Sequence, residues 1–231
     1  AGANKSSLVE FLYPNSTGYV ETPQIPNLQL PLRVGIAFTP ATLSGITGFT
    51  ETQKQELAHN VAARFADLEF VNNIEIIPSD YLRYQGSFAN LDQLRQLFNV
   101  DVIVLLSYDQ SVFVDNGLLS MTYWTIVGAY VVPGEKNDTQ TLIDAAVYDI
   151  ASRKLLFRAP GVSVIKSRST LIANWEQLRE DSIQGFSDAS AELTDNLSVE
   201  LERFQQRLKD SPDQFQISAR EGYTSIGSGS I

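Results

Sequence analysis

The sequence contains no cysteine and only one histidine and one methionine. Without cysteine the chain cannot form disulfides, use a thiolate nucleophile or bind zinc through sulfur. The single histidine, His59, excludes metal sites built from paired histidines, and any serine–histidine–aspartate triad would depend on it. Because His59 lies off the hydrophobic stripe of its predicted helix, we interpret it as a solvent-facing residue.

Motifs that carry nucleotide-binding or acyl-transfer chemistry are also missing. The sequence has no lysine-containing phosphate loop, no G-x-G-x-x-G after a predicted strand and no G-x-S-x-G. We therefore expect a protein that is not an enzyme and that holds no metal and no cofactor.

Basic residues are too few for a nucleic-acid-binding surface. The chain has 17 lysines and arginines and 27 aspartates and glutamates, which gives a net charge of −10. An acidic surface repels phosphate, so we expect no nucleic-acid partner. The run closest to the roughly 18 apolar residues of a membrane helix is 118–133, whose β-branched and aromatic residues favour a strand instead.

Composition divides the chain into three parts. Residues 1–29 are predicted to form a proline-rich, extended N-terminal arm, in which the stretch LVEFLY (8–13) is able to dock as an edge strand or a hydrophobic plug. Residues 30–210 are predicted to form a single domain. Residues 211–231, which end in glycine and serine, are predicted to form a flexible tail.

Strands and helices succeed one another regularly within 30–210. Thr50 and Gln53 fit a capping box that starts one helix, and Asn90 is a candidate cap for the next. The predicted elements are strands 30–38, 73–78, 100–109, 120–132, 141–150 and 154–165, and helices 51–68, 91–98 and 171–209. The strand 100–109 is apolar enough to be covered on both faces. The last helix carries a stripe at helical spacing: Trp175, Leu178, Ser182, Phe186, Ala189, Leu193, Leu197, Leu201, Phe204 and Leu208.

In chain order, the first five predicted elements alternate as strand, helix, strand, helix and strand. The last three strands are joined by short connections, which are typical of antiparallel hairpins. The sequence therefore predicts a mixed α/β (α+β) fold. It has a single mixed β-sheet ending in an antiparallel meander, packing helices, and a long C-terminal helix that bends near Gly185.

Carboxylates are numerous, and six of them lie in or beside predicted elements. They are Asp109, Asp115, Asp144, Asp149, Glu180 and Asp181. Paired carboxylates serve acid–base catalysis or hold a cation, but these spacings are not diagnostic, so we expect them on the solvated surface. Ser152 and Lys154 form an S-x-K in a predicted hairpin turn, where these residue types are common.

Two stretches are candidates for binding a partner. The loop 40–50 leaves the first strand and enters a helix N-terminus, where open α/β sheets tend to bind ligands. The side chains of the aromatic strand 120–132 alternate between two faces of the sheet. Packing in the core is the simpler interpretation of these aromatic residues, and any that are exposed would mark a partner surface. The predicted partner-surface residues are Gly45, Gly48, Tyr123, Trp124 and Tyr130.

Three stretches together make the sequence resemble the bacterial rhombotarget lipoproteins. They are SSLVEFLYP (6–14), FANLDQLRQLFNVDVIVLLSYDQ (88–110) and YWTIVGAYVVPGEKNDTQTLIDAAVYDIASRKLLFRAPG (123–161). The resemblance covers nearly the whole chain, and its most specific part runs from GEKNDTQT to the end of the third stretch. In that family the mature N-terminus is a lipid-modified cysteine, and a glycine-rich C-terminal motif is read by a rhomboid-type protease.

The resemblance implies a location in the bacterial cell envelope, facing the periplasm. It implies a lipid anchor upstream of Ala1 that attaches the protein to the membrane, and an envelope protein of unknown identity as partner. The implied recognition element for the protease consists of Gly222, Tyr223, Gly227 and Gly229.

Two other classes of function stay open from the sequence. A structural or assembly subunit of an envelope complex would associate through the aromatic strand or the long helix. A hydrolase that uses surface carboxylates would need Asp109, Asp115 or Asp144 to converge in a pocket.

Overall fold

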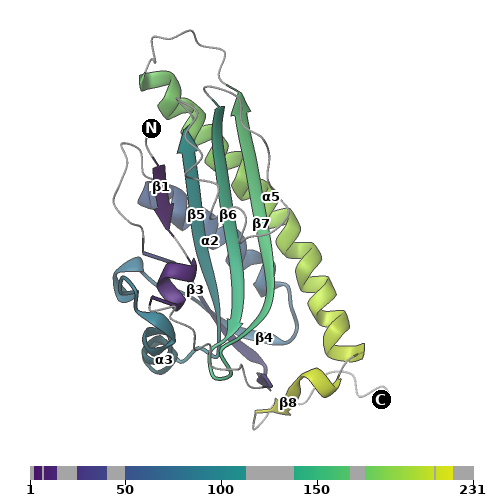
Figure 1. Cartoon of the computed structure of the whole chain (residues 1–231). Coiled ribbons are helices and arrows are strands. Elements are labelled where there is room, and N and C mark those ends of the chain that lie inside the picture. Colours follow the sequence, from purple (N-terminus) through teal and green to yellow (C-terminus); the bar gives the residue numbers. More distant parts are fainter. Residues whose placement is uncertain are drawn as a thin grey trace.

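The computed structural model describes residues 3–6, 8–14, 25–40, 50–112, 138–166, 175–210 and 212–220. The principal strands are β1 (Ala3–Ser6), β3 (Leu32–Phe38), β4 (Val71–Ile76), β5 (Val102–Val112), β6 (Asp138–Asp149) and β7 (Lys154–Lys166). They form a six-stranded sheet in the order β4–β3–β5–β6–β7, with β1 paired to the far end of β5 (Figure 1). β3 is parallel to β4 and β5, whereas β5, β6 and β7 are antiparallel neighbours. The predicted fold with one mixed sheet is confirmed.

Helices cover both faces of this sheet (Figure 1). They are α1 (Leu8–Leu12), α2 (Glu51–Ala66), α3 (Ser87–Phe98) and α5 (Trp175–Asp210). On β5, Val104 and Leu106 join the core under α2 and α5, while Ile103 and Leu105 join the core under α1 and α3. A strand buried on both faces reads as a continuous hydrophobic run, which is why this stretch was recognisable in the sequence.

The start of α2 follows the predicted capping box. The backbone N–H of Gln53 donates to Thr50 Oγ1 at 3.2 Å, and the backbone N–H of Thr50 donates to Gln53 Oε1 at 3.0 Å. These two bonds satisfy donors that the first turn of a helix leaves free. The capping box is therefore confirmed.

The predicted cap of α3 is wrong. The helix begins at Ser87, so Asn90 lies within its first turn and is buried. The Asn90 side chain accepts from the backbone N–H of Arg83 at 2.8 Å and donates to the carbonyl of Tyr81 at 3.2 Å. An asparagine can cap a helix or bind the turn before it, and the short 3₁₀ helix η1 (Ser79–Tyr81) supplies the turn here.

α5 is one continuous helix of 36 residues. The predicted stripe is buried against the sheet at Ser182, Phe186, Ala189, Leu193, Leu197, Leu201 and Phe204. Gly185, where we predicted a bend, lies inside this helix, and a Cβ there would come within 2.7 Å of Thr141 Oγ1. The absence of a side chain at Gly185 thus allows α5 to approach β6 closely.

The side chains of α5 also bind the outer edge of β7. The Val162 backbone N–H donates to the Glu192 carboxylate at 2.7 Å. Asn196 donates to the Pro160 carbonyl at 2.8 Å, and Arg207 donates to the Leu156 carbonyl at 2.7 Å. Edge strands that keep free backbone groups tend to pair with other chains. α5 therefore completes the core and occupies the edge of the sheet.

Both ends of the described chain pack onto the domain. Leu8, Phe11 and Leu12 of α1 are buried, so the LVEFLY stretch docks as a helical plug. β2 (Asn27–Leu30) pairs in parallel with β8 (Gln216–Ala219), which follows the short helix η3 (Pro212–Gln214). The domain therefore draws on residues on both sides of the predicted limits 30–210.

Asp101 ties this C-terminal strand to the sheet. The guanidinium of Arg33 binds both carboxylate oxygens of Asp101, at 2.7 and 2.9 Å, and the guanidinium of Arg220 binds one of them. Arg220 also donates its backbone N–H to the Leu30 carbonyl at 2.8 Å. We call β2, β8 and the ion pairs of Asp101 with Arg33 and Arg220 the C-terminal clasp.

Replacing Asp101 by asparagine is expected to lower the free energy of unfolding by about 2 kcal/mol near pH ~7, because two half-buried guanidinium groups lose their counter-ion. Burial alone would raise the pKa of Asp101, but the hydrogen bonds and charges of Arg33 and Arg220 outweigh it and lower the pKa. A lowered folded pKa gives stability that is present above the unfolded pKa of about 4 and is lost as the pH falls through the folded value. The difference between the two proteins in urea denaturation should therefore shrink below pH ~4.

Asp92→Asn is the matched control, because the Asp92 side chain is 44% exposed and lies 3.9 Å from Arg153. Such surface pairs contribute about 0–1 kcal/mol. An Asp101→Asn effect no larger than that of Asp92→Asn would show that the clasp does not stabilise the fold.

Candidate functional site

The residues predicted to bind a partner or a protease all lie outside the described part of the chain. They are Gly45, Gly48, Tyr123, Trp124, Tyr130, Gly222, Tyr223, Gly227 and Gly229. Their roles stay predictions. Asp115, one of the predicted carboxylates, lies outside it as well.

The expectation that the remaining carboxylates lie on the solvated surface is wrong for four of them. Asp109, Asp144, Asp149 and Asp181 are buried, whereas Glu180 is exposed as expected. The strands β5 and β6 are covered on both faces, so a polar residue in either strand is buried whichever way it points. His59 is exposed, which confirms its interpretation.

Asp144 is the most enclosed of these carboxylates, with 1% of the residue exposed. Arg158 from the neighbouring strand β7 binds it, with Nη2 2.9 Å from Oδ2 and Nε 3.2 Å from each oxygen. Burial raises the pKa of Asp144, and the charge and hydrogen bonds of Arg158 oppose that rise. The register places Asp144 opposite Ser107, with Asp109 two positions further along β5 on the same face. These polar groups therefore form a buried layer in the sheet.

The S-x-K sequence belongs to the turn between β6 and β7, as predicted. The Ser152 backbone N–H donates to Asp149 Oδ2 at 3.1 Å, and the Lys154 backbone N–H donates to Ser152 Oγ at 3.3 Å. Arg153 adopts a φ of 59°, which a tight turn often requires. Ser152 thus has a structural explanation within the hairpin.

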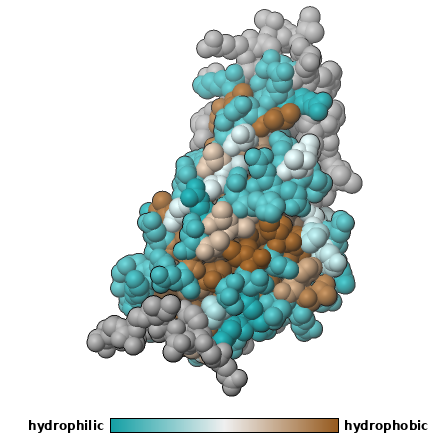
Figure 2. All heavy atoms as spheres, turned by 180° about the vertical axis from the view of Figure 1, so that it is seen from behind, coloured by the Kyte–Doolittle hydropathy of each residue, from teal (hydrophilic) through white to brown (hydrophobic). Residues whose placement is uncertain are grey.

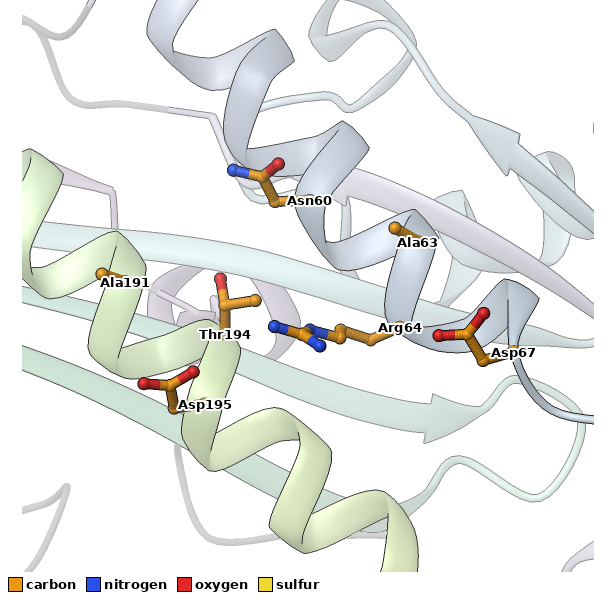
Figure 3. Close-up of a pocket in the computed structure, with 7 residues that line it drawn as sticks. All are labelled: Asn60, Ala63, Arg64, Asp67, Ala191, Thr194 and Asp195. Atoms are coloured by element: carbon orange, nitrogen blue, oxygen red, sulfur yellow. The ribbon is translucent and has the colours of Figure 1, made fainter.

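Residues of α2 and α5 line a groove between the two helices (Figure 3). Its volume is about 380 Å³, and its lining residues are Asn60, Ala63, Arg64, Asp67, Ala191, Thr194 and Asp195. The short side chains of Ala63 and Ala191 fill little of its volume. Arg64 extends from α2 towards Thr194 and Asp195 of α5 (Figure 3). We call this cavity the α2–α5 groove.

The groove carries more negative than positive charge. Asp67 and Asp195 stand against Arg64, and among the described residues neither carboxylate forms an ion pair within 4 Å. Asp67 is also the C-cap of α2, where the helix already has a partial negative charge. Two free carboxylates beside a helix C-terminus favour a cationic group in the groove.

Asp67→Asn is expected to raise the free energy of unfolding by about 0.5 kcal/mol, because it removes a charge that the end of α2 disfavours. Thermal denaturation of the two proteins measures the difference. Glu56→Gln, which removes an exposed carboxylate nearer the middle of the same helix, should change the stability less. A clear loss of stability on Asp67→Asn would mean that Asp67 makes a stabilising contact.

Hydrophobic residues lie on the same face of the molecule as α2 and α5. Figure 2 shows the face covered by α2 and α5, where hydrophobic residues gather near the middle and hydrophilic ones surround them. Leu68, Phe70 and Val71 follow α2 directly and are only partly buried. Val199, one helical turn after Asp195 on the same side of α5, is 45% exposed. The groove is thus polar and its surroundings are partly apolar.

Two features are absent from the part of the chain that the structure describes. No group of three histidine, aspartate or glutamate side chains there is placed to hold a metal ion. None of the helices described there has the length and apolarity needed to cross a membrane.

Comparison with solved structures gives similarities of low sequence identity. The PelC dodecamer from Paraburkholderia phytofirmans shares 13% identity over 77% of this chain and 91% of its own, with a TM-score of 0.34. A neuraminyllactose-binding hemagglutinin homolog from Helicobacter pylori shares 10% identity over 81% and 96%, with a TM-score of 0.38. Lipoprotein GNA1162 from Neisseria meningitidis shares 10% identity over 67% and 98%, with a TM-score of 0.27.

No protein-family model matches the sequence, and no curated protein matches it either. The structural similarities have low identity and TM-scores below 0.5, so they assign no function to this chain.

Sequence reasoning missed the α2–α5 groove. Its two walls are more than 120 residues apart in the chain, and each reads on its own as the solvated side of an amphipathic helix. One signal was available: residues 180–202 contain seven aspartates and glutamates and no lysine or arginine. Such a run on one helix indicates a strongly acidic surface, but only the fold shows what lies opposite.

Proposed function

We propose that this chain is a non-enzymatic, lipid-anchored protein of the bacterial cell envelope. It binds a protein partner, and a rhomboid-type protease reads its C-terminal tail. The resemblance of residues 123–161 and of two shorter stretches to the rhombotarget lipoproteins supports the location, the anchor and the protease. The predicted tail element is Gly222, Tyr223, Gly227 and Gly229.

The observation that carries the proposal is the C-terminal clasp. It holds the chain as far as Arg220, and the four tail residues follow immediately in the sequence. At the other end of the chain, Ala3 pairs with Ser111, ten residues along β5 from Asp101. Ten strand residues span about 33 Å, so an anchor attached before β1 and a protease acting after β8 would not compete for the same space.

The test is the intact mass of the native protein, extracted from its own cell envelope and from a strain that lacks the rhomboid-type protease. The proposal expects a lipid-sized increment at the N-terminus and a C-terminal loss that requires the protease. An unmodified mass that ends at Ile231 in both strains would refute the anchor and the processing together.

Substitutions in the tail separate recognition from accessibility. Gly227→Val with Gly229→Val should abolish the protease-dependent loss. Ser228→Ala with Ser230→Ala, in the same stretch but outside the predicted element, should leave it unchanged. Equal effects of the two pairs would contradict the assignment of the glycines.

A structural or assembly subunit is the second candidate, and the sheet edges favour it. α5 occupies the edge of β7, whereas the outer edge of β4 pairs with no strand among the described residues. An open edge is able to accept a strand from a neighbouring molecule. Sedimentation that shows only a monomer at high concentration would exclude assembly of the chain with itself.

A further inference from the structure

We propose that the α2–α5 groove binds a basic segment of a partner protein, one that carries lysine or arginine beside hydrophobic residues. This inference rests on the proposed function in one respect, because it names the surface and the partner chemistry of a partner-binding protein. The argument for it comes from the shape, the charge and the surroundings of the groove.

The shape suits a side chain or a short segment. The groove is open to solvent along two helices, and each of them contributes one alanine to its lining, Ala63 and Ala191 (Figure 3). Its volume of about 380 Å³ lies at the lower end of the range for ligand sites. Asn60 and Thr194 add groups able to hydrogen-bond a backbone or a side chain.

The charge selects a cation. Asp67 and Asp195 exceed Arg64 by one negative charge, and the C-terminus of α2 adds a further partial negative charge beside Asp67. Asp188 and Glu202, seven residues before and after Asp195, are exposed on the same side of α5 and extend the acidic surface along this helix. Complementary charge speeds encounter and selects the partner, and here it favours a basic one.

The surroundings favour hydrophobic neighbours in the bound segment. Leu68 and Phe70 lie just beyond Asp67, and Val199 lies one turn beyond Asp195. Apolar residues beside a polar groove are typical of a partner surface. A second copy of this chain is a poor occupant, because two molecules of charge −10 repel each other.

The experiment measures the binding of two fluorescent peptides to the purified full chain by anisotropy. One peptide has about twelve residues of alternating lysine and valine, and the other has glutamate in place of lysine. The inference expects saturable binding of the lysine peptide alone, weakened when NaCl rises from about 50 to about 300 mM.

Substitutions assign the binding to the groove. Asp67→Asn with Asp195→Asn should weaken it about tenfold or more. Asp80→Asn with Asp213→Asn removes the same charge at two exposed positions outside the groove and should have little effect. Arg64→Gln should strengthen binding more than Arg83→Gln, which removes an exposed arginine elsewhere. An unchanged circular dichroism spectrum and a cooperative thermal transition would establish that each variant is folded.

Three results would overturn the inference: no saturable binding of the lysine peptide, equal loss in the two double variants, or equal binding of the glutamate peptide. Photo-crosslinking in the native cell envelope distinguishes a failure of this inference from a failure of the proposed function. A photo-crosslinking amino acid replaces either Tyr130 or Ala191 of the full chain. If a crosslinker at Tyr130 captures a partner and one at Ala191 captures none, the groove is not the site and partner binding stands. If the peptide result holds while no position captures an envelope protein, the groove stands and the proposed function fails.

Discussion

Replacing Gly161 by alanine is expected to lower the free energy of unfolding by about 3–5 kcal/mol, more than at the other described glycines that have close neighbours. A Cβ at Gly161 would lie 1.9 Å from the Ala189 carbonyl oxygen and 2.6 Å from the Leu193 nitrogen. Both atoms belong to the backbone of α5, so no side chain can move aside. To accept the methyl group, α5 would have to move away from β7 as a whole.

Urea denaturation of the purified variant measures this effect, and Gly35→Ala is its matched control. A Cβ at Gly35 would meet side-chain atoms and not backbone, at 3.0 Å from Ile77 Cδ1 and 3.3 Å from Val100 Cγ2. We expect the control to cost only about 1 kcal/mol, because the crowding is milder and because alanine restricts the unfolded chain more than glycine, which offsets part of the cost. Equal stabilities of the two variants would show that α5 does not lie so close to β7.

Replacing Arg158 by leucine is expected to cost about 3–5 kcal/mol near pH ~7, because it leaves the enclosed carboxylate of Asp144 without a counter-ion. Burial already raises the pKa of Asp144, and the loss of Arg158 removes the main influence that opposes the rise. A carboxyl group with a raised folded pKa supports the fold below its unfolded pKa of about 4. That support is lost as the pH rises through the folded value. The cost of Arg158→Leu should therefore be largest near neutral pH and smaller in acid.

Two further measurements identify the cause. The double variant Asp144→Leu with Arg158→Leu should recover most of the lost stability, since it removes the charge together with its partner. Arg203→Leu, which removes an exposed arginine on α5, should cost less than about 1 kcal/mol at either pH. If Arg158→Leu lowers the free energy of unfolding equally near neutral pH and in acid, the aliphatic packing of Arg158 matters and its charge does not.

Local patterns predicted the parts of the fold that are made locally. The capping box at Thr50 and the periodic stripe from Ser182 to Phe204 were both found where the sequence placed them. The hydrophobic run of β5 indicated a strand covered on both sides, and the structure confirms it. In each case the residues that determine the element lie within a few positions of one another.

Long-range pairing could not be predicted in the same way. β2 and β8 are four residues each and lie nearly 190 positions apart, so neither shows a periodic pattern. The burial of Asp144 depends on Arg158 in the next strand, and single carboxylates in a sequence are usually solvated. The α2–α5 groove likewise exists only once two distant helices lie side by side.

The hydrogen bonds between α5 and the edge of β7 bear on how this protein would aggregate. Detachment of the helix would uncover an apolar sheet face and, in the same event, a free edge strand of thirteen residues. Partially opened molecules of that kind join edge to edge faster than they refold when the concentration is high. Heating should therefore produce a precipitate whose onset temperature falls with concentration, and the shelf life of the protein would depend on how rarely this single helix detaches.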